Sequence, residues 1–478
     1  MVQKYIAFIG LCLGFFIIMM DTTTVPLIYT TLMQGFDVSP VMVAWVNNTY
    51  LITYAAFLLL GGRLGDFTNR KIVVLIAYLT IGIGAAISGV GQTFTGVIIG
   101  RALMGVGAGL LTPQSMAYIT ILFGSGGRGT ALGIWGAVAG IATATGPVIT
   151  QVFLTIANWR WVMWINIPIV LACFLIAIWS LPNALGRGLK LWDTLVSSLF
   201  GLCLAGAIIG VQFISTAGSV MALGAVLLIG GTIIVVTLIK NDLKKNRGYI
   251  LSPELWLDSV FLRVCLISGL LGAGLTAFYL PLAFLLDVRM HFGPIAISII
   301  MITIAFSGAL VGPFAGNLSD RIEPERIVRL GLSLFAFANV LLGLIGIFVS
   351  GGRLALFSLC AVMVVAGSGA GLAFSPLANL ALRRAQVATV GRAAAFYNSV
   401  RQVSSALGGV IVATAFDTIV RLRLGHSLLI NAASLREASN ATADAALVCF
   451  LLIALCLATA AYMSCRESVE TCEELAER

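Results

Sequence analysis

The chain has 478 residues, of which 60% are hydrophobic and only 10% are charged, and its mean hydropathy is +1.06. A water-soluble protein of this size cannot be so apolar, because too little polar surface would remain to face the solvent. The composition therefore predicts an all-α integral membrane protein in a lipid bilayer. The net charge of +9 comes from basic residues scattered between apolar runs, which indicates topology rather than a nucleic-acid-binding patch.

Apolar runs long enough to span a bilayer, which needs roughly 20 residues, recur along the whole chain. The first six lie at about 5–29, 41–62, 72–90, 95–120, 130–153 and 161–181. Eight more lie at about 194–214, 220–240, 259–286, 294–316, 327–349, 354–380, 393–420 and 443–463. Fourteen transmembrane helices are therefore expected.

The placement of lysine and arginine between these runs predicts the orientation of the chain. Twenty of the 28 basic residues fall on the same side as the N-terminus, and six fall on the other side. Basic residues concentrate in cytoplasmic loops. We therefore expect a multi-pass protein of the cytoplasmic (inner) membrane with both termini in the cytoplasm.

The first predicted span contains an acidic residue, Asp21, followed by three threonines and Pro26. An unpaired charge within the bilayer costs roughly 2.5–3.5 kcal/mol on insertion scales, so Asp21 needs water, a partner or a proton. Thr22, Thr23 and Thr24 are potential hydrogen-bond donors to it, and Pro26 is a potential kink. Asp21 is a candidate proton carrier; the alternative is a carboxyl that only adjusts helix packing.

The fourth span contains Arg101, in the run Gly100-Arg101-Ala-Leu-Met-Gly105-Val-Gly107-Ala-Gly109. An arginine does not lose its proton, so it must face water or an acid inside a membrane. Gly105 and Gly109 lie on the same helical face as Arg101 and allow a neighbouring helix to approach closely. A role in proton coupling and a structural role, with the guanidinium bound to backbone carbonyls, both fit this pattern.

A short charged loop follows the second span and is repeated in the second half of the chain. It reads Gly62-Arg63-Leu64-Gly65-Asp66-Phe67-Thr68-Asn69-Arg70-Lys71, and Gly316-Asn-Leu-Ser-Asp320-Arg321 closes the tenth span. The two aspartates are 254 positions apart. A positive-inside loop alone explains the basic residues but not Gly62, Gly65 and Asp66. The repeat predicts two duplicated halves.

The fifth span has small residues at Gly133, Gly136, Gly140 and Ala144, followed by Gly146-Pro147. Small residues along one stripe permit tight helix packing, and Gly-Pro introduces a bend. The turn Asn158-Trp159-Arg160-Trp161 then leads to Asn166-Ile-Pro168.

Together these motifs resemble the major facilitator superfamily, and in particular its fourteen-helix drug:proton antiporter group. The loop G-x-L-x-D-x-x-x-R-K, the R-x-x-x-G-x-G run, the Asp-x-Thr opening and the W-R-W…N-x-P run carry this resemblance. The chain departs from the family pattern at Asn69, where glycine is usual, at Thr150-Gln151, where Gly-Gly is usual, and in the early position of Pro26. Asn69 is expected to adopt the left-handed backbone conformation in place of glycine.

The resemblance implies a major facilitator fold of two six-helix bundles plus two inserted helices. The expected domains are 1–190, 191–258 with the inserted helices and an inner loop, and 259–478. In the inner loop, Leu251, Leu255 and Trp256 are candidates for a short amphipathic helix on the membrane surface.

The resemblance also implies roles for individual residues. Asp21 and Arg101 are implied to couple transport to protons, and Gly136, Gly140, Gly146 and Pro147 to form the antiporter helix motif. The two repeated loops are implied to form a conformational gate, in which Asp66 docks near the start of the thirteenth span, around Arg392. The expected gate residues are Gly62, Gly65, Asp66, Arg70, Lys71, Asp320 and Arg321.

Several polar and aromatic residues are candidates for lining a substrate cavity. Arg401 lies in the thirteenth span next to Asn398, where a cavity, an interhalf or a purely structural role is open. Asp287 and Asp417 lie near the outer ends of their spans and are expected to be solvated rather than to bind substrate. The cavity candidates are Tyr50, Tyr54, Gln114, Trp135, Asn398 and Arg401.

The sequence argues against an enzyme. It has no HExxH, Gly-x-Ser-x-Gly or Walker-type phosphate-binding motif, and only two histidines, so neither a metal site nor direct use of ATP is expected. The expected function is proton-coupled efflux of lipophilic, cationic drugs or related amphiphiles by a monomer, with the proton as coupling ion and no cofactor. The alternative is export of an endogenous lipid, siderophore or metabolite on the same fold.

Overall fold

The computed structural model describes residues 2–184, 191–216, 220–245, 251, 253–319, 322–349, 351–383, 390–425 and 435–476. Helices form every regular element in these ranges. The first group comprises α1 (Val2–Thr24), η1 (Val25–Ile28), α2 (Tyr29–Phe36), α3 (Pro40–Phe67), α4 (Arg70–Val90), α5 (Phe94–Ile156), α6 (Trp159–Trp164) and α7 (Asn166–Ser180). The second comprises α8 (Leu191–Thr216), α9 (Met221–Lys245), α10 (Pro253–Leu257), α11 (Ser259–Phe284), η2 (Leu285–Arg289), α12 (Pro294–Leu318), α13 (Pro324–Phe348), α14 (Gly352–Arg383), α15 (Val390–Leu424) and α16 (Leu435–Ala476).

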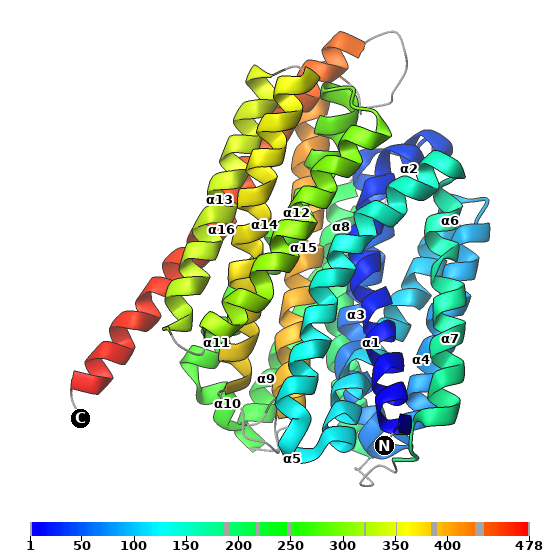
Figure 1. Ribbon diagram of the computed structural model, residues 1–478, viewed down its shortest axis with the longest axis vertical. Helices are drawn as coiled ribbons and strands as arrows, with labels where there is room; N and C mark the ends of the chain where they lie inside the picture. The colour runs from blue at the N-terminus through cyan, green and yellow to red at the C-terminus, as the bar shows by residue number, and fades with distance from the viewer. Residues whose placement is uncertain are drawn as a thin grey trace.

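Thirteen segments of the described chain are long and apolar enough to cross a membrane. They correspond to thirteen of the fourteen expected spans. The remaining one, 130–153, lies within α5, of which Thr145–Ile156 forms a shorter apolar helix. A straight helix of the 63 residues of α5 would measure roughly 95 Å, but its ribbon turns back at its label in Figure 1. Thirteen spans are therefore supported, and the fourteenth stays a prediction.

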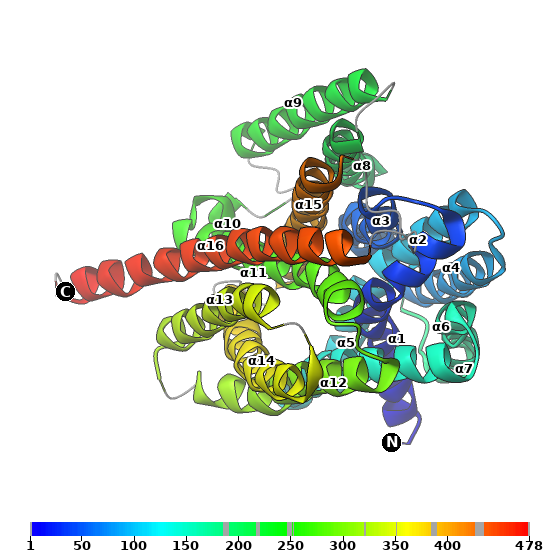
Figure 2. The same cartoon turned by 90° about the horizontal axis from the view of Figure 1, so that it is seen from above.

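The long helices stand side by side and define two ends of the molecule (Figure 1). We call the end at which α1 begins and α3 terminates the base, and the end at which α3 begins the top. Both α1 and α16 have their chain-terminal ends toward the base, and the last turns of α16 extend away from the bundle (Figures 1 and 2).

The helices pack as two groups that meet along two seams. Helices α1, α3, α4, α5 and α7 pack on one another, as do α11 to α16. The two groups meet where α3 packs on α15 and where α5 packs on α12. This is the arrangement that the internal repeat predicts, while the exact domain boundaries stay a prediction.

The two helices expected to be inserted, α8 and α9, lie outside the two bundles. Helix α8 packs on both α3 and α15, and α9 packs on α8 at the periphery (Figure 2). Only 6% of the apolar window of α9 is buried in the protein, so its side chains are left for lipid. The loop that follows differs from our expectation: Leu251 and Leu255 are buried in the protein core and do not face the membrane surface.

The first span changes direction where the sequence suggests a kink. Thr22, Thr23 and Thr24 each donate a hydrogen bond to the backbone carbonyl three residues earlier. Helix α1 then ends at Thr24, and a 3-10 turn containing Pro26 connects it to α2. Because proline has no N–H to donate, the regular helix cannot continue through it unchanged.

The top of the molecule is closed by a hydrophobic core shared by the two bundles. Val25, Ile28 and Leu32 of the first bundle belong to the same buried cluster as Leu282 and Leu285 of the second. Most of the first bundle has a second core, formed mainly by α1, α3, α4, α5 and α7, to which residues of α8 and Ala406 of α15 also belong. The two bundles are therefore packed together at the top, above the site described next.

Candidate functional site

The structure joins the two charged residues that the sequence places inside the first and fourth spans. Nη1 of Arg101 donates to Oδ2 of Asp21 in an ion pair between α1 and α5. Both side chains are fully enclosed, with exposed fractions of 0% and 1%. Neither charge alone would be stable in this apolar setting, but together they are neutral.

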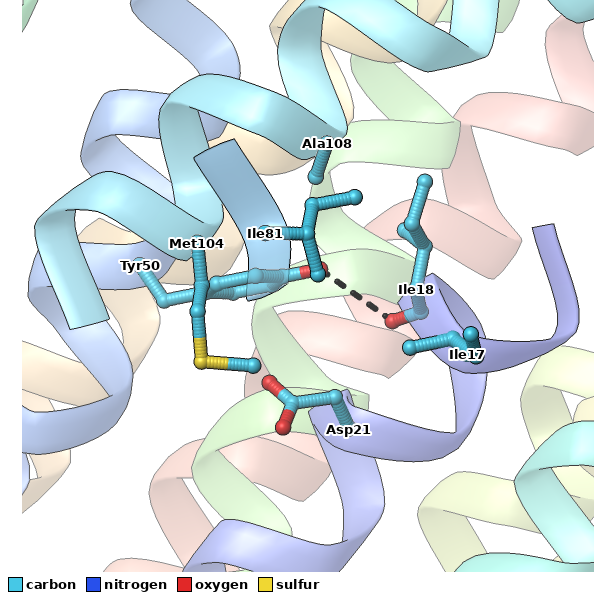
Figure 3. Close-up of a pocket in the computed structure, with 7 residues that line it drawn as sticks. All are labelled: Ile17, Ile18, Asp21, Tyr50, Ile81, Met104 and Ala108. Carbon is cyan, nitrogen blue, oxygen red and sulfur yellow. Dashed lines mark hydrogen bonds between the residues drawn. The ribbon is translucent and has the colours of Figure 1, made fainter. Parts of the chain in front are cut away.

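Arg101 has further partners on α3, besides a contact of its Nη1 with Met104 Sδ of α5 at 3.6 Å. Its Nε donates to the carbonyl oxygen of Val46 at 3.0 Å. Its guanidinium carbon lies 4.4 Å from the centroid of the Tyr50 ring, a cation–π contact. The Tyr50 hydroxyl in turn donates to the carbonyl of Ile18, one turn before Asp21, as Figure 3 shows. Tyr50 therefore lies within the ion-pair site.

The ion pair is incompletely satisfied. Oδ1 of Asp21 and Nη2 of Arg101 are buried, and neither has a hydrogen-bond partner among the described residues. A buried polar atom without a partner costs about 1–3 kcal/mol, and more when the group is charged. A narrow space lined by Asp21, Tyr50 and Met104 lies beside the carboxylate (Figure 3).

The Gly146-Pro147 motif of α5 packs against the same part of α1. A side chain at Gly146 would meet the Thr23 side chain and the carbonyl oxygen of Met20. Thr150, one turn later, donates to the carbonyl of Gly146 at 2.9 Å. The small residue thus lets α5 approach α1 directly beside Asp21.

A cavity of about 640 Å³ lies between the two bundles, within the usual size range of small-molecule sites. Helices α1 and α3 contribute to its wall from the first bundle, and α11, α12, α14 and α15 from the second. Along α12 and α14 the lining runs from the middle of each helix to its base end, at Asn317 and Asn379. Together with the closed top, this lining places the cavity in the middle and base of the molecule.

The lining combines apolar and polar side chains. The residues that line it are Met19, Thr22, Thr23, Leu51, Gly272, Leu275, Thr276, Tyr279, Ile304, Ala305, Gly308, Ala309, Gly312, Pro313, Gly316, Asn317, Gly367, Ala370, Gly371, Phe374, Ser375, Ala378, Asn379, Arg401, Gln402 and Ser405. Sequence reasoning missed most of the α12 and α14 wall. The glycines spaced by four residues, at 308, 312 and 316 and at 367 and 371, are the signal that could have indicated close packing there.

Of the six predicted cavity residues, Arg401 is the one found in this lining. Asn398 is next to it and accepts a hydrogen bond from Arg401 Nη2 at 2.9 Å. Tyr54 is buried and bonds Thr112 of α5 at 2.9 Å, and Trp135 stacks on Phe15.

The turn between α3 and α4 is held by Gln114 of α5. Nε2 of Gln114 donates to the carbonyl of Gly61 at 2.5 Å, and its Oε1 accepts from Arg70 Nη1 at 3.2 Å. A side chain at Gly65 would overlap the Gln114 amide. This contact explains why glycine stands at position 65, and it gives Gln114 a place in the turn rather than in the cavity.

Two residues of this turn, Asn69 and Lys71, make hydrogen bonds at the start of α4. Asn69 has φ −80° and accepts a hydrogen bond from the backbone N–H of Lys71 at 3.0 Å, so it is the N-cap of α4. Our expectation of a left-handed Asn69 is therefore wrong, because a helix cap requires an extended residue there. The Nζ of Lys71 donates to the carbonyl of Ile178 near the end of α7.

Several predicted gate and motif residues cannot be placed. The side chains of Asp66 and Arg392, the surroundings of Gly136 and Gly140, and all of Asp320 and Arg321 lie outside the described residues. Gly62 is described, and a side chain there would contact Pro113 at an ordinary 3.8 Å.

Asp417 differs from our expectation. It is 6% exposed and forms an ion pair with Arg421, one turn later on α15, at 2.6 Å. A buried carboxylate requires such a partner, so Asp417 is a paired residue rather than a solvated one.

Comparison with known sequences identifies the family. Residues 11–409 match the family model described as Major Facilitator Superfamily. The chain is 24% identical to the riboflavin transporter RibZ of Clostridioides difficile, covering 87% of this chain and 89% of that one. It is 27% identical to the puromycin resistance protein pur8 of Streptomyces alboniger, over 83% and 79% of the two chains. It is 26% identical to multidrug resistance protein 3 of Bacillus subtilis, over 88% and 81%.

Solved structures share the fold at low sequence identity. A POT family transporter in complex with 5-aminolevulinic acid has a TM-score of 0.68 at 14% identity, over 95% of both chains. The xylose transporter XylE of E. coli, in a partially occluded inward open conformation, has a TM-score of 0.60 at 14% identity, over 95% and 98%.

The matched model covers most of the chain, and the family that it describes is one of transporters, not of enzymes. The chain belongs to the major facilitator superfamily and is a multi-pass membrane transporter of small molecules.

Proposed function

We propose that this transporter exports amphiphilic small molecules in exchange for protons, by alternating access of the central cavity. One observation carries the proposal: a single segment of α1 bears both elements that such a cycle must couple. Asp21 points into the first bundle and pairs with Arg101, while its neighbours Thr22 and Thr23 line the cavity. A change at the ion pair therefore reaches the cavity wall within one helical turn.

The cycle follows from the electrostatics of the pair. Protonation of Asp21 removes the negative charge and leaves Arg101 with the Val46 carbonyl, the Tyr50 ring and Met104 Sδ as its partners. The pair then no longer draws α1 toward α5, and the α1 segment that lines the cavity is released. Each proton that moves down a 100 mV potential supplies about 2.3 kcal/mol to drive this change.

Two observations support export as the direction and amphiphiles as the cargo. The relatives include proteins named for puromycin resistance and for multidrug resistance. The cavity wall mixes apolar side chains such as Leu275 and Ile304 with polar ones such as Thr276 and Gln402, which suits a molecule with an apolar frame and a polar group.

We also propose that the turn between α3 and α4 acts as the gate at the base. Gln114 of α5 connects Gly61 of α3 with Arg70 of α4, so the base ends of three helices move together. In this proposal Asp66 docks on the second bundle when the base closes, where a helix N-terminus favours an anion.

The test uses inside-out membrane vesicles that contain the protein, energised with a proton gradient that is acidic inside. We expect accumulation of lipophilic dyes inside the vesicles, and collapse of this accumulation within seconds after a protonophore is added. Vesicles without the protein report passive uptake.

A gradient-independent uptake that the protonophore leaves unchanged would contradict proton coupling. Accumulation that requires ATP but no proton gradient would contradict it as well. Substrate entry into intact cells along the proton gradient would contradict the export direction.

A further inference from the structure

The charge on the cavity wall is positive. Arg401 is the one charged residue in the lining given above, and no aspartate or glutamate occurs among the described lining residues. Arginine does not lose its proton in proteins, so this charge is permanent. A cavity of this kind offers a lipophilic cation no counter-ion.

Arg401 is held so that its guanidinium remains available to a ligand. Its Nη2 donates to the neutral side chain of Asn398, and its guanidinium carbon lies 4.8 Å from the centroid of the Phe374 ring. Its alkyl chain packs where Gly272 leaves room, since a side chain at that glycine would come within 2.8 Å of Arg401 Cγ. The contacts with Asn398 and Phe374 hold the guanidinium in place, but neither partner carries a negative charge that would neutralise it.

The second intramembrane arginine provides an internal comparison. Arg101 is fully buried and has Asp21 as its counter-ion. Arg401 is only partly buried, faces the cavity, and forms no ion pair with a described residue. Because a charge inside a membrane requires water or a partner of opposite sign, the guanidinium of Arg401 must be met by water or by an anion that enters the cavity.

We propose that the transported molecule carries a carboxylate or a comparable anionic group on an apolar frame, and that Arg401 is the residue that binds this group. The proposal rests on the transport function proposed above and narrows its substrate class, in place of the cation expected from the sequence. A guanidinium binds a carboxylate through two parallel hydrogen bonds, and the hydroxyl of Ser405 and the amide of Gln402 lie on the same wall. The apolar frame then lies against Phe374, Leu275 and Ile304.

Equilibrium binding tests the charge preference without any need for transport. The purified protein is placed in nanodiscs of zwitterionic lipid, and the probes are a lipophilic carboxylate dye, its methyl ester and a lipophilic cation of similar size. We expect the carboxylate to bind at least about tenfold more tightly than the ester, a difference of about 1.4 kcal/mol.

Substitutions at Arg401 then test whether this residue causes the preference for the carboxylate over its ester. Arg401→Gln should bring the carboxylate down to the affinity of its ester, while Arg401→Lys should keep part of the preference. Arg326→Gln is the matched control, because Arg326 lies at the base, is 66% exposed and pairs with Glu323. Unchanged binding of the neutral ester to Arg401→Gln shows that this variant is folded.

Three results would overturn the proposal: equal affinity for the carboxylate and the ester, tighter binding of the cation, or an effect of Arg401→Gln of less than about twofold. Anionic phospholipid in the nanodiscs distinguishes the source of the anion. If the anionic phospholipid weakens binding of the carboxylate dye, the natural ligand of Arg401 is a lipid head group. If it does not, the natural ligand is a free amphiphilic acid. If the acid binds through Arg401 but no proton gradient drives its transport, the proposed function fails and this inference stands.

Discussion

At the scale of single residues, Asp21 is the group whose removal should separate binding from energy coupling. Asp21→Asn keeps the size of the side chain and can still accept a hydrogen bond from Arg101, but it cannot take up or release a proton. For one proton exchanged per cycle, a gradient of one pH unit supports about tenfold accumulation. We expect vesicles that carry the Asp21→Asn variant to show passive uptake only, measured with a fluorescent substrate at several pH gradients, with probe binding retained.

Asp37→Asn is the control for this experiment. Asp37 is exposed and has a left-handed backbone with φ 52°, a conformation that asparagine also tolerates. This variant should transport like the original protein. Transport by Asp21→Asn that still follows the proton gradient would show that another group carries the proton.

The residue scale also shows what sequence reasoning can reach. Asp21 and Arg101 could each be recognised alone, because a charge within an apolar run is costly. That they contact each other across 80 positions of sequence depends on the rotation of α1 and α5 about their axes. Asn69 was assigned the wrong conformation because its family counterpart is glycine, whereas its hydrogen bond to Lys71 makes it a helix cap.

At the scale of elements, Gly61 is one of the glycines that let α3 and α5 approach closely, whereas its neighbour Gly62 is not. A side chain at Gly61 would lie 2.5 Å from the carbonyl oxygen of Gly109 and 2.8 Å from Cα of Leu110, both backbone atoms of α5. Gly61→Ala must therefore push the helices apart. Overpacking of this kind costs about 1–3 kcal/mol, so we expect a lower melting temperature in detergent and reduced transport.

Gly62→Ala is the matched control, one residue further along the same helix. Its new methyl group would meet Pro113 at 3.8 Å, and alanine is favoured over glycine within a helix by roughly 0.5–1 kcal/mol. This variant should melt at the same temperature or slightly higher. Equal loss of stability in both variants would show that the α3–α5 distance is not set by Gly61.

This pair illustrates why elements are easier to predict than their contacts. The family motif points to Gly62, yet the backbone contact falls on Gly61. Lipid is as apolar as the protein interior, so a membrane helix lacks the one-sided hydrophobic pattern that would reveal its buried face. Span positions therefore followed from hydropathy, but the lining of the cavity along α12 and α14 did not.

At the scale of the whole molecule, the structure is closed at the top and hollow toward the base. The hydrophobic core closes the top where η1 packs on α11, and the cavity reaches the base ends of α12 and α14 at Asn317 and Asn379. Sequence repetition predicted two bundles, but it could not predict toward which end the cavity lies, because the alternating access proposed above requires the same chain to adopt both arrangements.

Labelling of Asn379→Cys tests both this state and the cytoplasmic position of the base. In a background without the nine native cysteines, a membrane-impermeant maleimide should label it in inside-out vesicles but not in intact cells. Glu323→Cys is the control, since Glu323 is 51% exposed at the base and should be labelled at one rate throughout. If Asn379→Cys reacts from outside intact cells, or resists the reagent in vesicles where Glu323→Cys reacts, then the base is not the open cytoplasmic end.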